Sequence, residues 1–171
     1  TEKLEGSSMT CYLINGEFGV CSRNIDLKRN EDNAFWEVAI RLDIESKMRS
    51  SGMDNFAIQG ELVGPGVQGN IYNLSELDFF VYDIYDIKEG NYVNPQSRIK
   101  TYMPLLKLKH VPVISDNFNL CCVLTKENLL NMAEGYSELF RTQREGLVFK
   151  SLTTPNKSFK VVSNKYLLGE K

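Results

Sequence analysis

Lys3 heads a short pattern that could carry covalent chemistry. Lys3-Leu4-Glu5-Gly6 places a lysine three residues before a glycine near the start of the chain. A lysine amine is a nucleophile only when it is neutral, and burial, neighbouring cations or a bound metal lower its pKa from an ordinary value of about 10.4. A surface lysine before a turn fits the same residues. The pattern alone therefore does not distinguish a nucleophile from a solvated side chain.

Further motifs with charged or aromatic side chains follow in order. They are Ser22-Arg23-Asn24, Gly60-Glu61-Leu62-Val63-Gly64, Phe79-Phe80-Val81-Tyr82-Asp83-Ile84, Glu145-Gly146-Leu147-Val148-Phe149-Lys150 and Ser158-Phe159-Lys160-Val161-Val162-Ser163-Asn164-Lys165-Tyr166. Each motif alone also fits a core strand, a solvated strand end or a basic surface. Their joint order resembles that of ATP-dependent RNA ligases, which are covalent nucleotidyltransferases. The resemblance is strongest to the RNA ligase 2-like branch, including members whose catalytic core follows an N-terminal OB domain.

This resemblance covers nearly the whole chain and implies both a fold and a reaction. The expected fold is α+β, a nucleotidyltransferase domain over residues 1–171 in which mostly antiparallel sheets flank an ATP pocket, as in ATP-grasp-like ligase adenylylation domains. In the expected reaction, a lysine attacks the α-phosphorus of ATP, the AMP moves to an RNA 5′-phosphate, and a 3′-hydroxyl displaces it to seal the strand. Each step is an in-line displacement at phosphorus, which depends on positioning and on neutralising charge.

The resemblance also assigns the residues of the ATP pocket, position by position. Lys3 is the expected nucleophile, and Gly6 completes its motif. Glu2 would accept a hydrogen bond from the adenine amino group and so favour ATP over GTP. Arg23 would bind phosphate, a task that suits a bidentate guanidinium.

Two carboxylates, a second lysine and an aromatic ring complete the expected site. Glu61 would hold the ribose hydroxyls or a hydrated metal, and Glu145 would help to hold Mg²⁺ or Mn²⁺, since hard cations favour oxygen ligands. Lys160 would grip the α-phosphate, so that Glu145 and Lys160 join the nucleophile as catalytic residues. Phe80 would stack on adenine, from the strand face that alternation gives to both Phe80 and Tyr82.

Two features depart from the family pattern. The closing motif often has two lysines separated by one residue, but here Val162 stands two positions after Lys160. Either Lys165 supplies the second cation or the position is a real loss. The chain also has no initiator methionine, so we expect a domain excised from a longer protein, whose upstream segment helps to form the site and to engage pyrophosphate or RNA.

Turn residues mark the strands that must carry these motifs. Asn15-Gly16 predicts a two-residue hairpin turn, because both positions tolerate positive φ. The expected strands are residues 10–14, 18–23, 56–63, 77–85, 146–151 and 159–163, with a glycine-rich loop at 64–70 and a turn at 154–157. The helices are not regularly interleaved with these strands, which favours α+β over a doubly wound parallel sheet.

Capping residues predict two helices among the strands. Asp32 or Asn33 can cap a helix that runs to about Ser50. Thr125 can cap a second helix that ends near residue 140.

Composition and charge describe a globular protein and limit its partners. Hydrophobic residues make up 42% and charged residues 25% of the 171 positions, and no apolar stretch is long enough to span a bilayer. The net charge of −2 argues against a protein that coats nucleic acid by bulk electrostatics, so an RNA partner requires a local basic groove. Lys100, Lys107, Lys109 and His110 could form a basic strip, although a solvated strand face is the simpler explanation.

The cysteine and histidine content argues against several classes of site. The four cysteines show no Cys-x-x-Cys spacing, and Cys121 and Cys122 would point to opposite faces of a strand. Neither a zinc site nor a disulfide framework is expected, and an intracellular, reducing setting in the cytoplasm or nucleus fits better. His110 is the only histidine, and nothing marks a serine or cysteine beside it, so a hydrolase triad is not expected either.

Several functions remain open at this level. The first is an RNA ligase acting, as a monomer, on RNA with 3′-hydroxyl and 5′-phosphate ends, expected as a nicked duplex. The second is a non-catalytic module of the same fold that binds a nucleotide or an RNA end. Val162 favours this module slightly, whereas Lys3, Glu61 and Glu145 oppose it. A DNA ligase, a GTP-using capping enzyme and an unrelated α+β domain with chance matches are the remaining alternatives.

Overall fold

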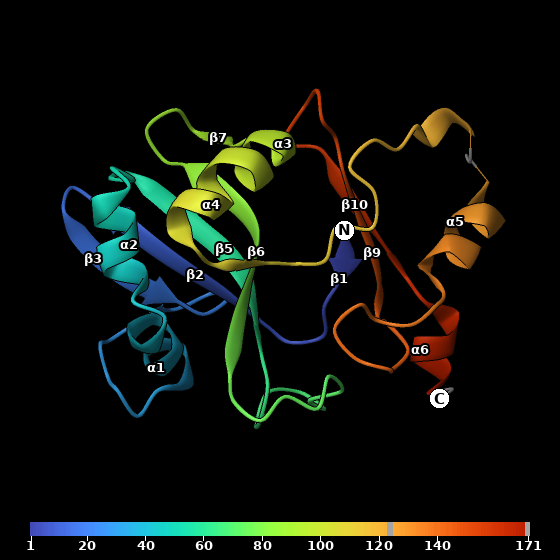
Figure 1. Ribbon diagram of the computed structural model, residues 1–171, viewed down its shortest axis with the longest axis horizontal. Helices are drawn as coiled ribbons and strands as arrows, with labels where there is room; N and C mark the ends of the chain where they lie inside the picture. Colours follow the sequence, from blue (N-terminus) through green and yellow to red (C-terminus); the bar gives the residue numbers. More distant parts are fainter. Residues whose placement is uncertain (123–124, 170–171) are drawn as a thin grey trace.

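The structure is a computed structural model that describes residues 1–122 and 125–169, apart from the side chain of Cys122. Its strands form two sheets (Figure 1). The larger, seven-stranded sheet contains β2 (Ser7–Ile14), β3 (Glu17–Cys21), β4 (Asp26–Leu27), β5 (Phe56–Val63), β6 (Asp78–Asp86), β7 (Asn91–Tyr92) and β8 (Lys109–His110). The smaller, three-stranded sheet contains β1 (Glu2–Lys3), β9 (Gly146–Lys150) and β10 (Ser158–Val162). The helical segments are α1 (Ala34–Arg41), α2 (Ile44–Ser50), α3 (Pro95–Ser97), the π-helical turn η1 (Arg98–Tyr102), α4 (Met103–Leu106), the 3₁₀ turn η2 (Leu120–Cys122), α5 (Lys126–Ala133) and α6 (Asn164–Leu168).

Antiparallel pairing builds most of the seven-stranded sheet, as predicted. Its strand order is β4-β3-β2-β5-β6-β7, and β8 joins β6 in parallel. The hairpin at Asn15-Gly16 is confirmed, since both residues have positive φ and the flanking strands pair across them. β5 and β6 pair through a bulge between Gln59 and Gly60, which leaves Tyr82 without a partner on β5. The alternation of side chains along β6 therefore changes at Tyr82.

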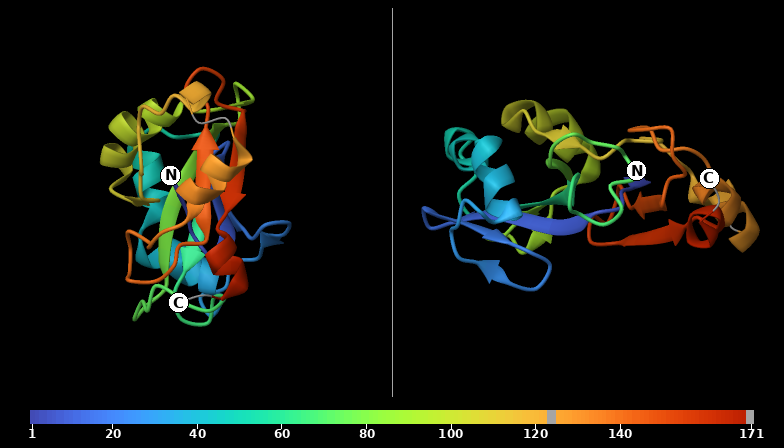
Figure 2. Two further views of the ribbon diagram at one scale, coloured as in Figure 1. Left: turned by 90° about the vertical axis from the view of Figure 1, so that its right-hand side faces the viewer. Right: turned by 90° about the horizontal axis from the view of Figure 1, so that it is seen from below.

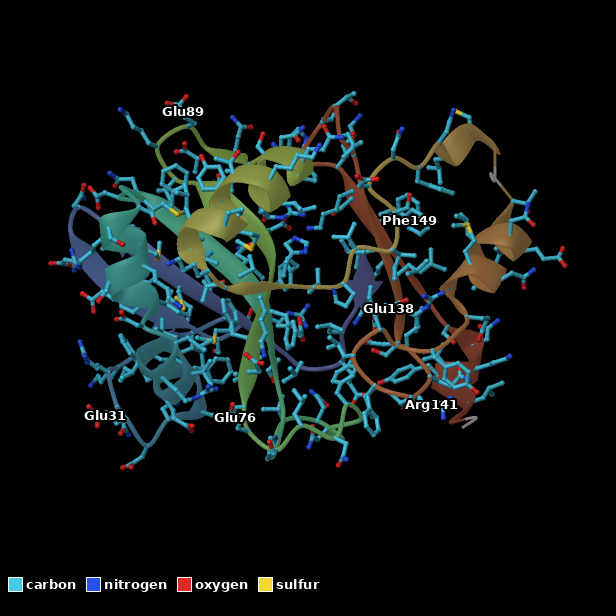
Figure 3. All side chains as sticks on the ribbon, in the orientation of Figure 1. Glu31, Glu76, Glu89, Glu138, Arg141 and Phe149 are labelled. Atoms are coloured by element: carbon cyan, nitrogen blue, oxygen red, sulfur yellow. The ribbon has the colours of Figure 1, made fainter. Side chains whose placement is uncertain are left out.

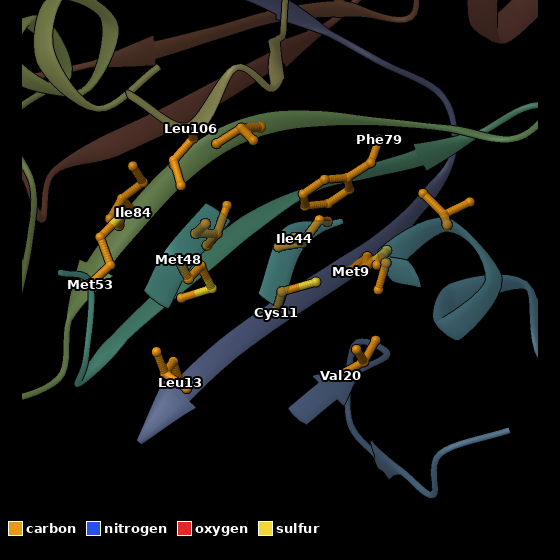
Figure 4. Packing of buried hydrophobic residues seen from close by; sticks show 14 of the residues in the cluster. Met9, Cys11, Leu13, Val20, Ile44, Met48, Met53, Phe79, Ile84 and Leu106 are labelled. Atoms are coloured by element: carbon orange, nitrogen blue, oxygen red, sulfur yellow. The ribbon is translucent and has the colours of Figure 1, made fainter. Parts of the chain in front are cut away.

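The main hydrophobic core lies between one face of this sheet and the helices α1, α2 and α4. Met9, Cys11 and Leu13 point from alternate positions of β2 into the core, and Ile44 and Met48 meet them from α2 (Figure 4). All five side chains are at most 2% exposed. The two-residue period of the strand and the roughly four-residue period of the helix place these apolar residues on facing surfaces.

The first predicted helix is in fact two helices. Asn33 caps α1, because its side chain accepts hydrogen bonds from the N–H groups of Phe35 and Trp36. Asp43 then adopts a left-handed conformation with a φ of 51°, which separates α1 from α2. The prediction of one continuous helix was wrong because the apolar spacing continues across this break.

The second predicted helix is correct at its start and too long at its end. Thr125 caps α5 as expected, but α5 ends at Ala133. Arg144 donates hydrogen bonds to the carbonyl oxygens of residues 132–134. A helix leaves its last carbonyls unpaired, so this arginine satisfies groups that continuation of the helix would have satisfied.

The three-stranded sheet joins the two ends of the chain. β1 pairs with β9 and β9 pairs with β10, all antiparallel, so the N-terminal strand lies beside the C-terminal third of the sequence (Figure 1). Viewed from below in Figure 2, this sheet and α2 lie in opposite halves of the long axis. The β9–β10 turn contacts the larger sheet: Asn156 Oδ1 accepts a hydrogen bond from the N–H of Tyr92, and Asn94 Nδ2 donates to the carbonyl of Leu152.

Other sequence expectations meet mixed outcomes. Cys11, Cys21 and Cys121 carry no disulfide bond. Cys121 lies in η2 and not on a strand, and the side chain of Cys122 lies outside the described part. Lys107 is the left-handed C-cap of α4, so it does not share a strand face with Lys109. Within residues 1–122 and 125–169, no helix is both long and apolar enough to cross a membrane.

Candidate active site

One pocket brings together most of the residues that the sequence motifs predicted. Its volume is about 660 Å³, and its lining comes from both sheets, from the loop at residues 22–25 and from α1. The predicted site residues that line it are Glu2, Lys3, Gly6, Arg23, Glu61 and Lys160. Glu145 reaches this group through its contact with Lys3. Phe80 does not line the pocket.

Lys3 and Glu145 form an ion pair in this pocket. Lys3 Nζ lies 2.5 Å from Glu145 Oε1, and the two side chains are 21% and 16% exposed. The pairing of β1 with β9 brings them together, because Lys3 is the register partner of Gly146, the residue after Glu145. This contact holds the amine of Lys3 on a carboxylate. A nucleophilic role for Lys3 therefore requires that this contact be released.

Glu61 is the other acidic group close to Lys3. Burial raises the pKa of Glu61 to about 7; the charge of Lys3 opposes this rise and the charge of Glu145 adds to it. Two carboxylates thus share one lysine in a partly dehydrated pocket. Such an arrangement is electrostatically unfavourable until a further cation or a proton enters it.

The same two carboxylates fit a hydrated divalent cation. In the described part of the chain, no three His, Cys, Asp or Glu side chains are grouped closely enough to hold a metal. Mg²⁺ does not need such a cage, because it keeps several waters and binds proteins through one or two carboxylates. Glu61 and Glu145 match that donor set, and burial is the main reason that the pKa of Glu61 is raised.

Phe80 and Tyr82 were predicted to share one face of β6, and of these two rings Tyr82 is the one that lines the pocket. Phe80 is 5% exposed and packs in a small hydrophobic cluster that includes Leu4 and Val111. Tyr82 and the next residue, Asp83, both line the pocket, because the bulge interrupts the alternation at this point. The ring available to a base in this pocket is therefore that of Tyr82.

A partly buried network of charged side chains lies beside Tyr82. Asp83 accepts hydrogen bonds from Lys150 and, at 2.8 Å, from Arg98 Nη1. Lys150 Nζ lies 5.5 Å from the centre of the Tyr82 ring, and burial lowers the pKa of Lys150 against the opposing effect of Asp83. His110 accepts a hydrogen bond from Arg98 Nε, and burial together with the charge of Arg98 lowers the pKa of His110 to about 4. His110 is therefore neutral and structural.

Glu2 is buried with one carboxylate oxygen unpaired. Its exposed fraction is 1%; Oε2 accepts a hydrogen bond from the N–H of Glu138 at 2.9 Å, and Oε1 has no hydrogen-bond partner among the described residues. Burial raises the pKa of Glu2 above its usual value. A buried acceptor without a donor costs free energy, and in native proteins such groups commonly await a ligand or water. Glu2 Oε1 is thus a free acceptor at the wall of the pocket.

The residues after Lys3 fix the loop that presents it. A Cβ atom at Gly6 would lie 2.4 Å from the carbonyl oxygen of Leu62, so only glycine fits where the chain crosses β5. Glu5 Oε1 accepts a hydrogen bond from the N–H of Gly69 at 3.0 Å, and Glu5 Oε2 accepts one from the Tyr166 hydroxyl at 2.5 Å. The motif therefore ties the glycine-rich loop and α6 to the segment that carries the lysine.

The closing motif contributes one lysine to the pocket. Lys160 lines it from β10, whereas Lys165 is exposed on α6 and does not reach it. Val162 pairs with Gly146 of β9. Lys165 thus does not replace the missing second lysine of the motif, and Lys150 lines the pocket as a cation to which sequence reasoning gave no role.

Sequence reasoning missed Tyr82, Asp83, Val148 and Lys150 as lining residues. Val148 and Lys150 had a detectable signal, because alternation along β9 places them on one strand face with Gly146. Alternation had placed Tyr82 on the strand face of Phe80, whereas Asp83 had no signal, since the bulge depends on how β5 and β6 pair.

Comparisons with known proteins identify the family of the chain. The RNA ligase family model matches residues 1–166. Similar solved structures include Naegleria gruberi RNA ligase as a glutamate-to-alanine mutant with AMP and Mn (38% identity, TM-score 0.89), as a lysine-to-alanine mutant with ATP and Mn (37%, 0.87) and with PPi (37%, 0.87). Each similarity covers 99% of this chain and 50% of the other, so the chain spans about half the length of these relatives. The comparison with curated proteins found no match. The chain belongs to the RNA ligase family.

Proposed function

We propose that the chain is the catalytic core of an ATP-dependent RNA ligase in which Lys3 accepts AMP from ATP. The observation that carries this proposal is the Lys3–Glu145 ion pair beside Glu61, in a pocket that Arg23 and Lys160 also line. The solved structures with ATP and Mn, with AMP and Mn and with PPi support it, because these are the substrate, the transferred group and the leaving group of lysine adenylylation.

The adenine end of the pocket has an acceptor and a ring in suitable places. Glu2 Oε1 is buried and unpaired, and an adenine amino group would donate to it, whereas the carbonyl of guanine at the same position would repel it. Tyr82 offers its ring to the base, in place of the Phe80 ring that the motif suggested. Val148 also lines the pocket, as an apolar surface from β9. ATP would therefore be preferred to GTP.

The phosphate end holds the cations. Arg23 lines the pocket from the loop between β3 and β4 and Lys160 lines it from β10, and both cations are suited to bind phosphate oxygens. Glu61 and Glu145 would hold a hydrated Mg²⁺ or Mn²⁺ ion, which supplies charge neutralisation when bound.

The first chemical step requires Lys3 to change partners. While Glu145 holds the amine of Lys3, that amine is not available to attack phosphorus. When this contact opens, Lys3 can release a proton to water and attack the α-phosphorus with its lone pair. The Nζ–P bond then forms, the bond from phosphorus to the bridging oxygen breaks, and pyrophosphate leaves. Lys160 would stabilise the charge that develops on the α-phosphate oxygens.

The later steps would pass AMP to RNA. The 5′-phosphate of an RNA strand displaces Lys3 and takes up the AMP, and a 3′-hydroxyl then displaces AMP to form a phosphodiester. We propose a nicked duplex as the substrate and a monomer as the acting unit.

A labelling experiment tests the proposal. The chain is incubated with α-labelled ATP and Mg²⁺, beside Lys3→Ala and, as a matched control, Lys88→Ala, whose lysine is exposed on the β6–β7 turn. We expect an acid-labile, alkali-stable protein label in the parent and in Lys88→Ala but not in Lys3→Ala. Parallel reactions with GTP, and with nicked RNA or nicked DNA, separate an RNA ligase from a capping enzyme and a DNA ligase.

A non-catalytic binding module is the second candidate, and one observation favours it. The closing motif supplies Lys160 alone, because Val162 occupies the second lysine position and Lys165 lies outside the pocket. A folded parent chain that binds ATP in the labelling experiment but gains no label would favour this candidate.

A further inference from the structure

A second cavity lies on the other side of β9 from the ATP pocket. Its volume is about 510 Å³, and its lining comes from β9, β10, α3, η1 and the segment at residues 113–120. Val148, Lys150 and Ser158 line both cavities, so the two share a wall. No residue that the motifs assigned to ATP lines the second cavity.

Phenylalanine rings form one side of this cavity. Phe149 of β9 and Phe159 of β10 are register partners, and their rings stack with centroids 4.8 Å apart and planes 7° from parallel. Phe118 contacts Phe149 from the segment before α5, with ring centroids 5.8 Å apart; Figure 3 shows Phe149 beside this segment. Phe118 and Phe159 are 37% and 41% exposed. Aromatic surface is thus available to a ligand that can stack on it.

The charged residues around the rings favour an anionic ligand. The cavity is lined by the cations Arg98, Lys150 and Lys157 and by one acid, Asp116, although the whole chain has a net charge of −2. Asp83 pairs with both Arg98 and Lys150. Lys157 is exposed and makes no ion pair with any residue in the described part. A phosphate beside Lys157 would meet an unpaired positive charge.

We propose that this cavity binds a nucleotide of the RNA substrate that leaves the duplex beside the nick, with its base against Phe149 and Phe159 and its phosphate near Lys157. Single-stranded RNA is generally recognised by this combination of exposed aromatic rings and cations. A surface that only docked another protein segment would need the rings but not the cations. The proposal rests on the proposed RNA ligase function, and it would place an RNA nucleotide one strand away from Lys3.

RNA-binding measurements on surface variants test this site. The probe is a short, single-stranded, 5′-phosphorylated RNA that carries 2-aminopurine near its 5′ end. Phe159→Leu keeps an apolar side chain but removes the ring, and Phe159→Trp restores a ring. Lys157→Gln removes the cation, and Lys88→Gln is the matched control on an exposed turn away from the cavity. Because Phe159 and Lys157 lie at the surface, we expect all four variants to fold.

The parent chain should bind the probe and quench its fluorescence. Phe159→Leu should weaken binding about 5- to 150-fold and abolish the quenching, since a stacked base contributes about 1–3 kcal/mol, and Phe159→Trp should restore both. Lys157→Gln should reduce the slope of log affinity against log salt by about 0.7, the value for one phosphate contact on a single strand. Lys88→Gln should behave as the parent.

Three results would contradict the proposed RNA site. The first is a parent chain that does not bind the probe at low salt, and the second is a Phe159→Leu variant that binds the probe as tightly as the parent. The third is a Phe159→Leu variant in which only the oligomeric state changes, which would identify a protein interface. AMP labelling of Lys3 without RNA is measured in parallel and should be the same in all variants. If the parent gains no label, the ligase proposal fails, but the binding data still decide whether the cavity takes RNA.

Discussion

Replacing Glu61 by glutamine should stabilise the protein at neutral and alkaline pH while it removes a carboxylate that the reaction needs. In the folded protein the pKa of Glu61 is raised from 4.5 to about 7, chiefly by burial. Between these two values the folded chain binds more protons at Glu61 than the unfolded chain does. The free energy of unfolding therefore falls as the pH rises from about 4.5 to about 7.

The size of the effect follows from the two pKa values. Each pH unit between 4.5 and about 7 corresponds to about 1.4 kcal/mol, so ionised Glu61 destabilises the fold by about 3 kcal/mol at pH 8. Glutamine has a similar shape and no charge. Glu61→Gln should therefore be about 3 kcal/mol more stable than the parent at pH 8 and nearly equal to it at pH 4.

Urea denaturation from pH 4 to pH 8, with EDTA present, measures this difference. Trp36 is the one tryptophan and is 3% exposed, so its fluorescence reports unfolding. Glu89→Gln is the matched control, because Glu89 lies exposed at a turn of the larger sheet (Figure 3). It should follow the parent at every pH. A Glu61→Gln variant that is less stable than the parent at pH 8, or whose difference does not grow with pH, would refute the electrostatic reasoning.

Further substitutions test other contacts. Gly6→Ala should abolish AMP transfer and lower the free energy of unfolding by about 1–3 kcal/mol, measured in urea, because its Cβ would lie 2.4 Å from the Leu62 carbonyl oxygen; full activity would contradict this. Tyr82→Leu should raise the KM for ATP about tenfold with little change in Tm, whereas Phe80→Leu should lower Tm with little change in KM; the reverse pattern would restore the sequence prediction. Arg144→Met should lower the free energy of unfolding by about 2–3 kcal/mol without changing KM, since the carbonyls at the end of α5 lose their donor, and an unchanged urea midpoint would contradict it.

Local signals in the sequence predicted the strands and the starts of the helices. Asn15-Gly16 forms the hairpin turn, and Asn33 and Thr125 cap their helices as expected. These features depend on a few neighbouring residues, so their chemistry is visible in a single sequence. The ends of the helices were missed because Asp43 breaks the first helix through its backbone conformation and Arg144 satisfies the end of α5 from a distant position.

The candidate site likewise has some residues that the sequence predicted and others that it did not. The motifs predicted that Lys3, Glu61 and Lys160 share a pocket, because each motif is short and its order along the chain is informative. The assignment of the base-facing ring to Phe80 came from the resemblance of its motif, and alternation placed Tyr82 on the same strand face. Asp83 also lines the pocket because a bulge at Tyr82 breaks the alternation, and bulges follow from the pairing of two strands that are distant in sequence.

Mass spectrometry of the chain after incubation with ATP and Mg²⁺ tests the central claim most directly. The intact chain should gain the mass of one AMP. After protease digestion at alkaline pH, fragmentation should place that mass on the peptide that contains Lys3. Treatment with pyrophosphate should remove it, since the step is reversible. An AMP group on another residue, or a folded chain that binds ATP and never gains the mass, would contradict the account of Lys3 as the nucleophile.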